Sequence, residues 1–225
     1  SYGLVEWLRR EGHRSLDRVV VSHAHPDHVA GLLAVLREVE VGGLVVPRPP
    51  MAGEGMMTDL WTQAQARGVP VLLGSTIATG SARSGRWQAA RAGPLDAQVL
   101  HPLAGWQAPR RRSANDESLV VRIRYGARSF LFTGDIERAA ESWLVQGPQL
   151  AALRSDVVKV PHHGSHSSSS SPFVSAVAAQ IAVVSAGQGN AFDHPRPSAL
   201  ARWAGVPVVR TDRDGTVAVS TDGVD

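Results

Sequence analysis

The stretch Ser22-His23-Ala24-His25-Pro26-Asp27-His28 decides how this chain folds and what it can bind. The apolar run Val19–Val21 stands before it and is typical of a buried strand, whereas residues 29–39 carry apolar side chains at helical spacing. The histidines and the aspartate therefore occupy a tight turn between a strand and a helix. Imidazole and carboxylate groups bind Zn or Mn, and one turn can direct several of them to one point.

The H-x-H-x-D-H spacing divides these ligands into two pairs. We expect His23 and His25 to bind one metal ion and Asp27 and His28 to bind a second. The alternative is a histidine-rich surface turn without a metal. The aspartate and the apolar flanks favour the metal site.

Length and composition are typical of a globular protein. The 225 residues are enough for one large domain, 43% of them are hydrophobic, and we expect residues 1–225 to form a single domain. No apolar run approaches the roughly 18 residues that cross a bilayer, so we expect no membrane insertion. There is no cysteine, which excludes sulfur ligands and disulfides. The net charge is +3, and arginine far outnumbers lysine. This charge permits contact with a polyanion.

Periodicity along the chain predicts alternating helices and strands, with a hairpin between them. The expected helices are Tyr2–Arg10, Asp59–Arg67, Ile136–Val145, a helix ending at Ala179 and Ser198–Ala204. The expected strands are Asp17–Ser22, Leu44–Val46, Val69–Leu73, short strands within Thr76–Val99, Gln98–His101, Ser118–Arg124, Ser129–Thr133, Asp156–Val160, Ile181–Ser185, Val206–Arg210 and Thr216–Ser220. This alternation suits two packed sheets with helices outside, an α/β architecture of the αβ/βα sandwich type.

Asp135 follows the apolar strand residues Phe130–Phe132 and a glycine. Its carboxylate can therefore project from the edge of a sheet. A carboxylate between two divalent ions can bridge them and offset their repulsion. Asp135 also precedes a predicted helix, so the alternative is a helix N-cap. Beside the histidine motif we favour the bridge.

His162 and His163 follow another buried strand. Neighbouring side chains diverge, so we expect one of them, His163 by preference, to reach a metal ion. The other would touch the substrate or support a ligand from behind. A polar loop without a metal is the alternative. Ser165 and the serines after it can donate hydrogen bonds to phosphate, although a solvated loop is an equally good interpretation.

These motifs resemble a known family. The H-x-H-x-D-H spacing resembles that of the metallo-β-lactamase superfamily. Further segments resemble ComEC-type DNA-uptake proteins: Asn115–Val120, Phe132–Asp135, Val158–Ser165, Asn190–Pro195 and Arg210–Asp212 with Gly215. The resemblance implies an αβ/βα four-layer sandwich. The family's domain normally opens with strands that carry a Gly-Gln-Gly-Asp pattern, and this chain lacks them, so we expect a fragment of a larger protein without its first N-terminal strands.

The resemblance implies a metal-dependent nuclease that degrades the DNA strand left outside during natural transformation. Its cofactors would be two divalent metal ions, Mn or Zn. Its partners would be DNA, in particular single-stranded DNA, together with the membrane channel and other domains of the same protein. Its place would be the extracytoplasmic face of the bacterial inner membrane. The alternatives are a free-standing hydrolase of a small phosphodiester or ester, and a non-catalytic module that binds DNA or a partner.

The resemblance also suggests roles for single residues. Many superfamily members have a histidine ligand where this chain offers Asn115 and Asp116, and an oxygen ligand there would move the preference from Zn toward Mn. Asp27 would orient the nucleophile and His194 would protonate the leaving oxygen or support a ligand. The remaining candidates bind substrate: Asn115, Ser165 and Asn190 in loops, and Arg110, Arg111 and Arg112 on the phosphate backbone or as solvated charges.

Overall fold

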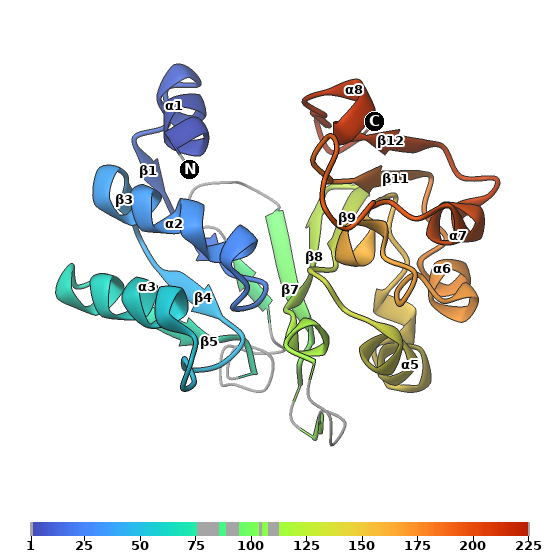
Figure 1. Ribbon diagram of the computed structural model, residues 1–225, viewed down its shortest axis with the longest axis horizontal. Coiled ribbons are helices and arrows are strands. Elements are labelled where there is room, and N and C mark those ends of the chain that lie inside the picture. Colours follow the sequence, from blue (N-terminus) through green and yellow to red (C-terminus); the bar gives the residue numbers. More distant parts are fainter. Residues whose placement is uncertain (1, 76–85, 89–94, 104, 108–112, 225) are drawn as a thin grey trace.

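A computed structural model describes residues 2–75, 86–88, 95–103, 105–107 and 113–224 (Figure 1). The first half of the chain contains three helices and five short strands among these residues. They are α1 (Tyr2–Arg10), β1 (Ser15–Leu16), β2 (Val19–Val20), α2 (Pro26–Glu38), β3 (Glu40–Val41), β4 (Leu44–Val46), α3 (Gly55–Ala66) and β5 (Val71–Leu73).

The second half supplies the larger sheet and the helices that cover it. Its elements are β6 (Arg86–Gln88), β7 (Leu95–His101), β8 (Val120–Tyr125), β9 (Arg128–Phe132), α5 (Arg138–Gln146), β10 (Val157–Lys159), α6 (Ser171–Val177), β11 (Ile181–Val184), α7 (Pro197–Leu200), β12 (Val208–Arg210) and α8 (Thr211–Asp214). Short 3-10 turns lie at Asn115–Glu117, Leu150–Ala152, Pro161–Gly164 and Ala201–Trp203.

The strands form two principal sheets. The smaller has the order β2-β4-β5 and is parallel throughout. The larger has the order β12-β11-β10-β9-β8-β7-β6, and its pairing changes from parallel to antiparallel at the β8–β9 hairpin. Strands β1 and β3 form a separate parallel pair. Strands β2, β9 and β10 are each followed directly by a polar turn, so three polar turns reach the same region.

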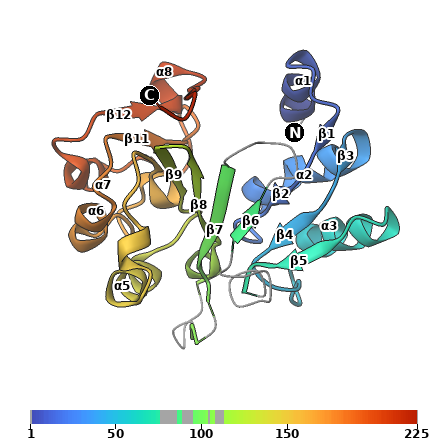
Figure 2. The same cartoon turned by 180° about the vertical axis from the view of Figure 1, so that it is seen from behind.

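Each sheet carries its helices on one face, and the two sheets face each other (Figures 1 and 2). One apolar core joins the small sheet to α1, α2 and α3, and a second joins the large sheet to α5 and α6. A third, smaller core lies between the sheets and contains Val45 of β4, Val99 of β7 and Val121 of β8. This arrangement confirms the expected αβ/βα four-layer sandwich.

Several expected boundaries are wrong. No strand forms at Thr216–Ser220, because the alternating valines find no neighbouring strand among the described residues, and Val219 remains 44% exposed. The chain instead turns into α8 directly after β12. The strand expected at Gln98–His101 begins earlier, at Leu95, because it pairs along β8. Much of Thr76–Val99 lies outside the described residues.

Helix α5 begins at Arg138, not at Ile136. Asp135 and Ile136 form the turn before it, and Glu137 occupies the N-cap position. The carboxylate of Asp116 accepts hydrogen bonds from the backbone N–H groups of Glu137 and Ala140, at 2.8 and 3.2 Å. Asp116 therefore caps α5, and Asp135 does not.

Among the described residues, no helix has the length and apolar character needed to span a membrane.

Candidate metal centre

Four side chains from three turns converge at one point. They are Asp27 and His28 after β2, Asp135 after β9 and His163 after β10, and one possible ligand atom from each lies within 4.8 Å of the others. Oδ2 of Asp135 lies 3.3 Å from Nε2 of His28 and 3.2 Å from Nε2 of His163. Oδ2 of Asp27 lies 3.3 and 3.4 Å from the same two nitrogens. Two imidazoles and two carboxylates around one point suit a Zn or Mn ion.

The two imidazoles are oriented by hydrogen bonds on their far sides. Nδ1 of His163 donates to the carbonyl of Ser185 at 2.6 Å. Nδ1 of His28 lies 2.9 Å from the hydroxyl of Ser22, so the protonated Nδ1 tautomer donates there. In both rings the Nε2 lone pair then faces the cluster, which is the arrangement that metal-binding histidines have.

Asp135 is placed by a crowded turn. Gly134 has a φ of +54°, and a Cβ there would lie 2.6 Å from the Cβ of Ser118, so only glycine fits. The backbone N–H of Asp135 donates to Ser118 Oγ at 3.0 Å. Burial alone would raise the pKa of Asp135, but the neighbouring imidazoles of His163 and His28 and the charge of Lys159 hold it well below its usual range. The carboxylate is therefore ionised, as a metal ligand must be.

Lys159 is a contact of this centre that the sequence reasoning missed. Its Nζ lies 3.4 Å from Oδ1 of Asp135 and donates to the carbonyl of Gly134 at 2.9 Å. The sequence did contain a signal, since Lys159 is the only lysine among the 23 Lys and Arg residues. A chain that uses arginine at every other basic position places the compact ammonium group beside this carboxylate.

A second ion would have to bind His23 and His25, and the structure supplies partial support for it. His23 is buried, and its ring centroid lies 4.6 Å from that of His25. Burial, then the neighbouring His28, lowers the pKa of His23 to about 3, so its ring is neutral. Nε2 of His23 lies 3.9 Å from Oδ2 of Asp135 and is buried without a hydrogen-bond partner. Oδ1 of Asn115 is likewise buried without a partner. Unpaired buried polar atoms on neutral or anionic groups are what a metal ion would satisfy.

His162 and His163 diverge because both have left-handed backbone angles, with φ of +48° and +52°. Whereas His163 joins the cluster, His162 turns toward α5, with Nδ1 3.3 Å from Oε1 of Glu137 and Nε2 3.4 Å from Nδ2 of Asn115. The neighbouring His162 lowers the pKa of Glu137 to about 2. The structure thus brings His163, and not His162, to the four-residue cluster.

His194 stands at the rim beside His162, with their ring centroids 5.6 Å apart. Its ring stacks on the exposed Phe192, and its Nδ1 is buried without a hydrogen-bond partner. Burial, then the charge of His162, lowers the pKa of His194, so its ring is neutral at neutral pH. His194 therefore lies close to the centre but outside the cluster.

The other predicted substrate contacts are placed differently. The amide of Asn190 bonds within its own loop, donating to the carbonyl of His194 at 2.6 Å and accepting from its N–H at 2.9 Å. Ser165 is buried, and its hydroxyl bonds to that of Ser167 at 2.9 Å. Both residues therefore support loops. Arg110, Arg111 and Arg112 lie outside the described residues.

A pocket of about 330 Å³ opens beside the cluster. His28, Ser22 and Lys159 form its polar end. Its walls are apolar and come from both sheets: Val20, Leu119, Val121, Ile123 and Phe132. Val20 and Phe132 are 39% and 47% exposed, so this pocket is open to solvent.

Comparison with known proteins agrees with this geometry. The family model described as "Metallo-beta-lactamase superfamily" matches residues 2–188. The chain is 31% identical over 217 residues to "Competence protein ComA" of Neisseria gonorrhoeae, covering 96% of this chain and 27% of that protein. It is 28% identical over 216 residues to "ComE operon protein 3" of Bacillus subtilis (strain 168), covering 95% of this chain and 26% of that protein. The resemblance indicated by the motifs is confirmed, and the chain spans about a quarter of these relatives.

A solved structure shares the fold. The chain superposes on the "CmlA beta-hydroxylase E377D mutant" with a TM-score of 0.52, covering 88% of this chain and 43% of that one. The sequences are only 16% identical, so this likeness concerns the fold alone.

Proposed function

This chain belongs to the metallo-beta-lactamase superfamily, and from that premise we propose that it is a metal-dependent phosphodiesterase that cleaves DNA. The observation that carries the proposal is the convergence of Asp27, His28, Asp135 and His163, whose ligand atoms lie within 4.8 Å of one another. A divalent ion bound there would polarise phosphoryl oxygens and lower the pKa of a water molecule. The nitrogen and oxygen donors suit Mn or Zn.

The residues around the cluster have distinct tasks in this proposal. The side chain of Asp27 is 62% exposed, so this carboxylate would help to hold the ion and would orient the attacking water. His194, neutral at the rim, would donate a hydrogen bond from its ring N–H to the leaving oxygen. His162 is held by Glu137 beside it and contacts a non-bridging oxygen of the substrate. Asn115 completes the site for a second, weaker ion with His23 and His25.

The printed names of the relatives support DNA as the substrate. Because two of them are named as competence or ComE operon proteins, we propose that the chain works as one part of a DNA-uptake protein. In that setting it would degrade the strand that is not imported, outside the inner membrane and next to the channel of the same protein. Single-stranded DNA is the substrate we propose, and residues 1–225 act as one domain.

Metal-dependent cleavage tests the proposal directly. The chain is stripped of metal, and cleavage of single-stranded DNA, plasmid DNA and a small phosphodiester such as bis(p-nitrophenyl) phosphate is followed with added Mn or Zn. DNA cleavage that needs the metal and is lost in Asp135→Asn supports the proposal. Cleavage of the small diester alone would indicate a small-molecule hydrolase. Metal-independent DNA binding without any cleavage would indicate a non-catalytic module.

A further inference from the structure

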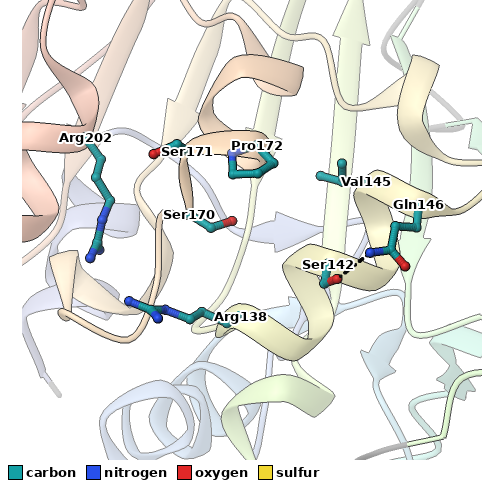
Figure 3. A pocket seen from close by; sticks show the side chains of 8 residues that line it. All are labelled: Arg138, Ser142, Val145, Gln146, Ser170, Ser171, Pro172 and Arg202. Atoms are coloured by element: carbon teal, nitrogen blue, oxygen red, sulfur yellow. Dashed lines mark hydrogen bonds between the residues drawn. The ribbon is translucent and has the colours of Figure 1, made fainter.

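A second pocket lies on the outer side of the large sheet, away from the apolar pocket beside His28. It has a volume of about 500 Å³ and is formed where α5, α6 and the 3-10 turn Ala201–Trp203 meet. Two arginines, Arg138 and Arg202, lie on its wall with Ser142, Gln146, Ser170 and Ser171 (Figure 3). The proposed chemistry at the metal centre uses none of these residues.

The charge of this pocket is not compensated. Figure 3 shows the side chains of Arg138 and Arg202 extending toward one another. In the part of the chain that the structure describes, no carboxylate lies within ion-pair distance of either guanidinium, and none lines the pocket. Glu141 of the same helix as Arg138 is fully buried, and its carboxylate accepts hydrogen bonds from the backbone N–H groups of Ser169 and Ser170. The pocket therefore presents two positive charges to solvent.

One of the two arginines is held in place. The guanidinium of Arg202 donates from one nitrogen to the carbonyls of His166 and Ser168, at 3.2 and 2.7 Å. Its remaining N–H groups stay available for an acceptor, since a guanidinium has five donors. Hydroxyl donors stand nearby, because Ser142 accepts from Gln146 at 3.0 Å and its own proton remains free. Fixed guanidinium and hydroxyl donors match the oxygens of a phosphate group.

Arg138, which lines this pocket, is adjacent in sequence to a residue that lies near the metal centre. Arg138 follows Glu137, which lies 3.3 Å from His162. Arg138 also borders a neighbouring pocket with Asp116, Glu137, His166 and Ser167. The segment from His163 to Ser171 has eight steps, so its ends are at most about 29 Å apart even if the chain were fully extended. A short single strand of DNA can cover this distance.

We propose that the pocket between Arg138 and Arg202 binds a backbone or terminal phosphate of the DNA strand whose cleaved bond lies at the metal centre. The inference rests on the proposed DNA substrate and adds a place where the strand is held outside the centre. It assigns to Arg138 and Arg202 the phosphate contacts that the sequence suggested for Arg110, Arg111 and Arg112.

The test measures binding in the absence of metal, so that cleavage plays no part. The chain is kept in EDTA, and the anisotropy of a short labelled single-stranded oligonucleotide is followed at several salt concentrations. Arg138→Gln is the informative variant, because the described part of the chain shows no hydrogen bond from the Arg138 side chain that the fold would lose. Arg37→Gln, an exposed arginine near the end of α2, is the matched control.

Arg138→Gln should weaken oligonucleotide binding roughly threefold to tenfold, and Arg138→Glu should weaken it further. The slope of log K against log salt should fall by about 0.7 for each phosphate that the variant no longer neutralises. Arg37→Gln should match the unchanged chain. Equal melting temperatures show that the variants are folded.

Competition by inorganic phosphate distinguishes two possible ligands of the pocket, a phosphate of the DNA strand and the free phosphate ion. If it competes with the oligonucleotide on the unchanged chain and much less on Arg138→Gln, the pocket holds a phosphate of the strand. If phosphate binding needs Arg138 but the oligonucleotide binds all variants equally, the pocket takes only the free ion and the inference is wrong. Arg138-dependent DNA binding without any metal-dependent cleavage would refute the proposed nuclease but would still show that this pocket binds a phosphate of DNA.

Discussion

The two carboxylate oxygens of Asp135 face different partners: Oδ1 lies 3.4 Å from Nζ of Lys159, whereas Oδ2 lies 3.2 and 3.3 Å from the imidazoles of His163 and His28. Nε2 of His23 also approaches Oδ2, at 3.9 Å. The lysine thus holds one oxygen, and the histidines surround the other. Oδ2 is therefore the oxygen of Asp135 that would hold a metal ion.

Lys159→Met should lower the affinity for Mn or Zn roughly 10- to 100-fold, the range found when a partner that orients a metal ligand is removed. The ammonium also repels a cation, which acts in the opposite direction. We expect the loss of orientation to exceed the relief of repulsion, because Oδ1 would lose its charged donor and the carboxylate would be free to rotate. A calorimetric titration with Mn or Zn measures the change in affinity. An increase in affinity would show that repulsion dominates.

Asp135→Asn should abolish metal binding at the cluster and DNA cleavage with it, because asparagine keeps the shape but lacks the charge. The free energy of unfolding should fall by about 1–3 kcal/mol, since Lys159 loses its anionic partner. Helix α5 should be unaffected because Asp116 caps it. Elemental analysis, denaturation and a cleavage assay measure the three effects. The control is Asp193→Asn, whose side chain is 81% exposed. Two bound metals in Asp135→Asn would refute the ligand assignment.

His162→Ala and His163→Ala should differ in kind. His163→Ala removes a member of the cluster, so metal content and cleavage should be lost together. His162→Ala should keep the metal but lose turnover, because this ring contacts Glu137 and Asn115 instead. Metal content and kcat are measured on both variants. Full metal content in both variants would remove the Pro161–Gly164 turn from the metal site.

Glu54→Gln should destabilise the chain at pH 7 and less so in acid. Arg48 donates a hydrogen bond to the carboxylate of Glu54 at 2.6 Å. This bond is the main reason why the pKa of Glu54 lies below its ordinary value of 4.5. The folded pKa lies below the unfolded one, so the stabilisation is complete above about pH 4.5 and is lost as the pH falls through the folded pKa. Both side chains are partly exposed, so we expect about 1 kcal/mol at pH 7. Urea denaturation across this range measures the difference, which should shrink toward acid, whereas a constant difference would contradict the ion pair.

The local pattern of the sequence predicted the fold and the composition of the centre. Alternation of apolar strands and helices is a local property, and so is the position of His23, His25, Asp27 and His28 on one turn. A strand followed by a polar turn also indicated that Asp135 and the His162–His163 pair reach a common edge. The confirmed sandwich shows that this reasoning sufficed for the architecture.

Only the tertiary structure decided which side chains meet. His163 enters the cluster because the carbonyl of Ser185, directly after β11, holds its Nδ1. Asp116 is not part of the metal cluster, because its carboxylate accepts hydrogen bonds from the N–H groups of Glu137 and Ala140 at the start of α5. Asp135 is therefore not needed to cap this helix. The valines after Gly215 alternate as in a strand, but no strand in the described part of the chain lies beside them to pair with. In each case the deciding partner is distant in sequence, and hydrogen bonds between distant groups form only once the strands and helices have packed.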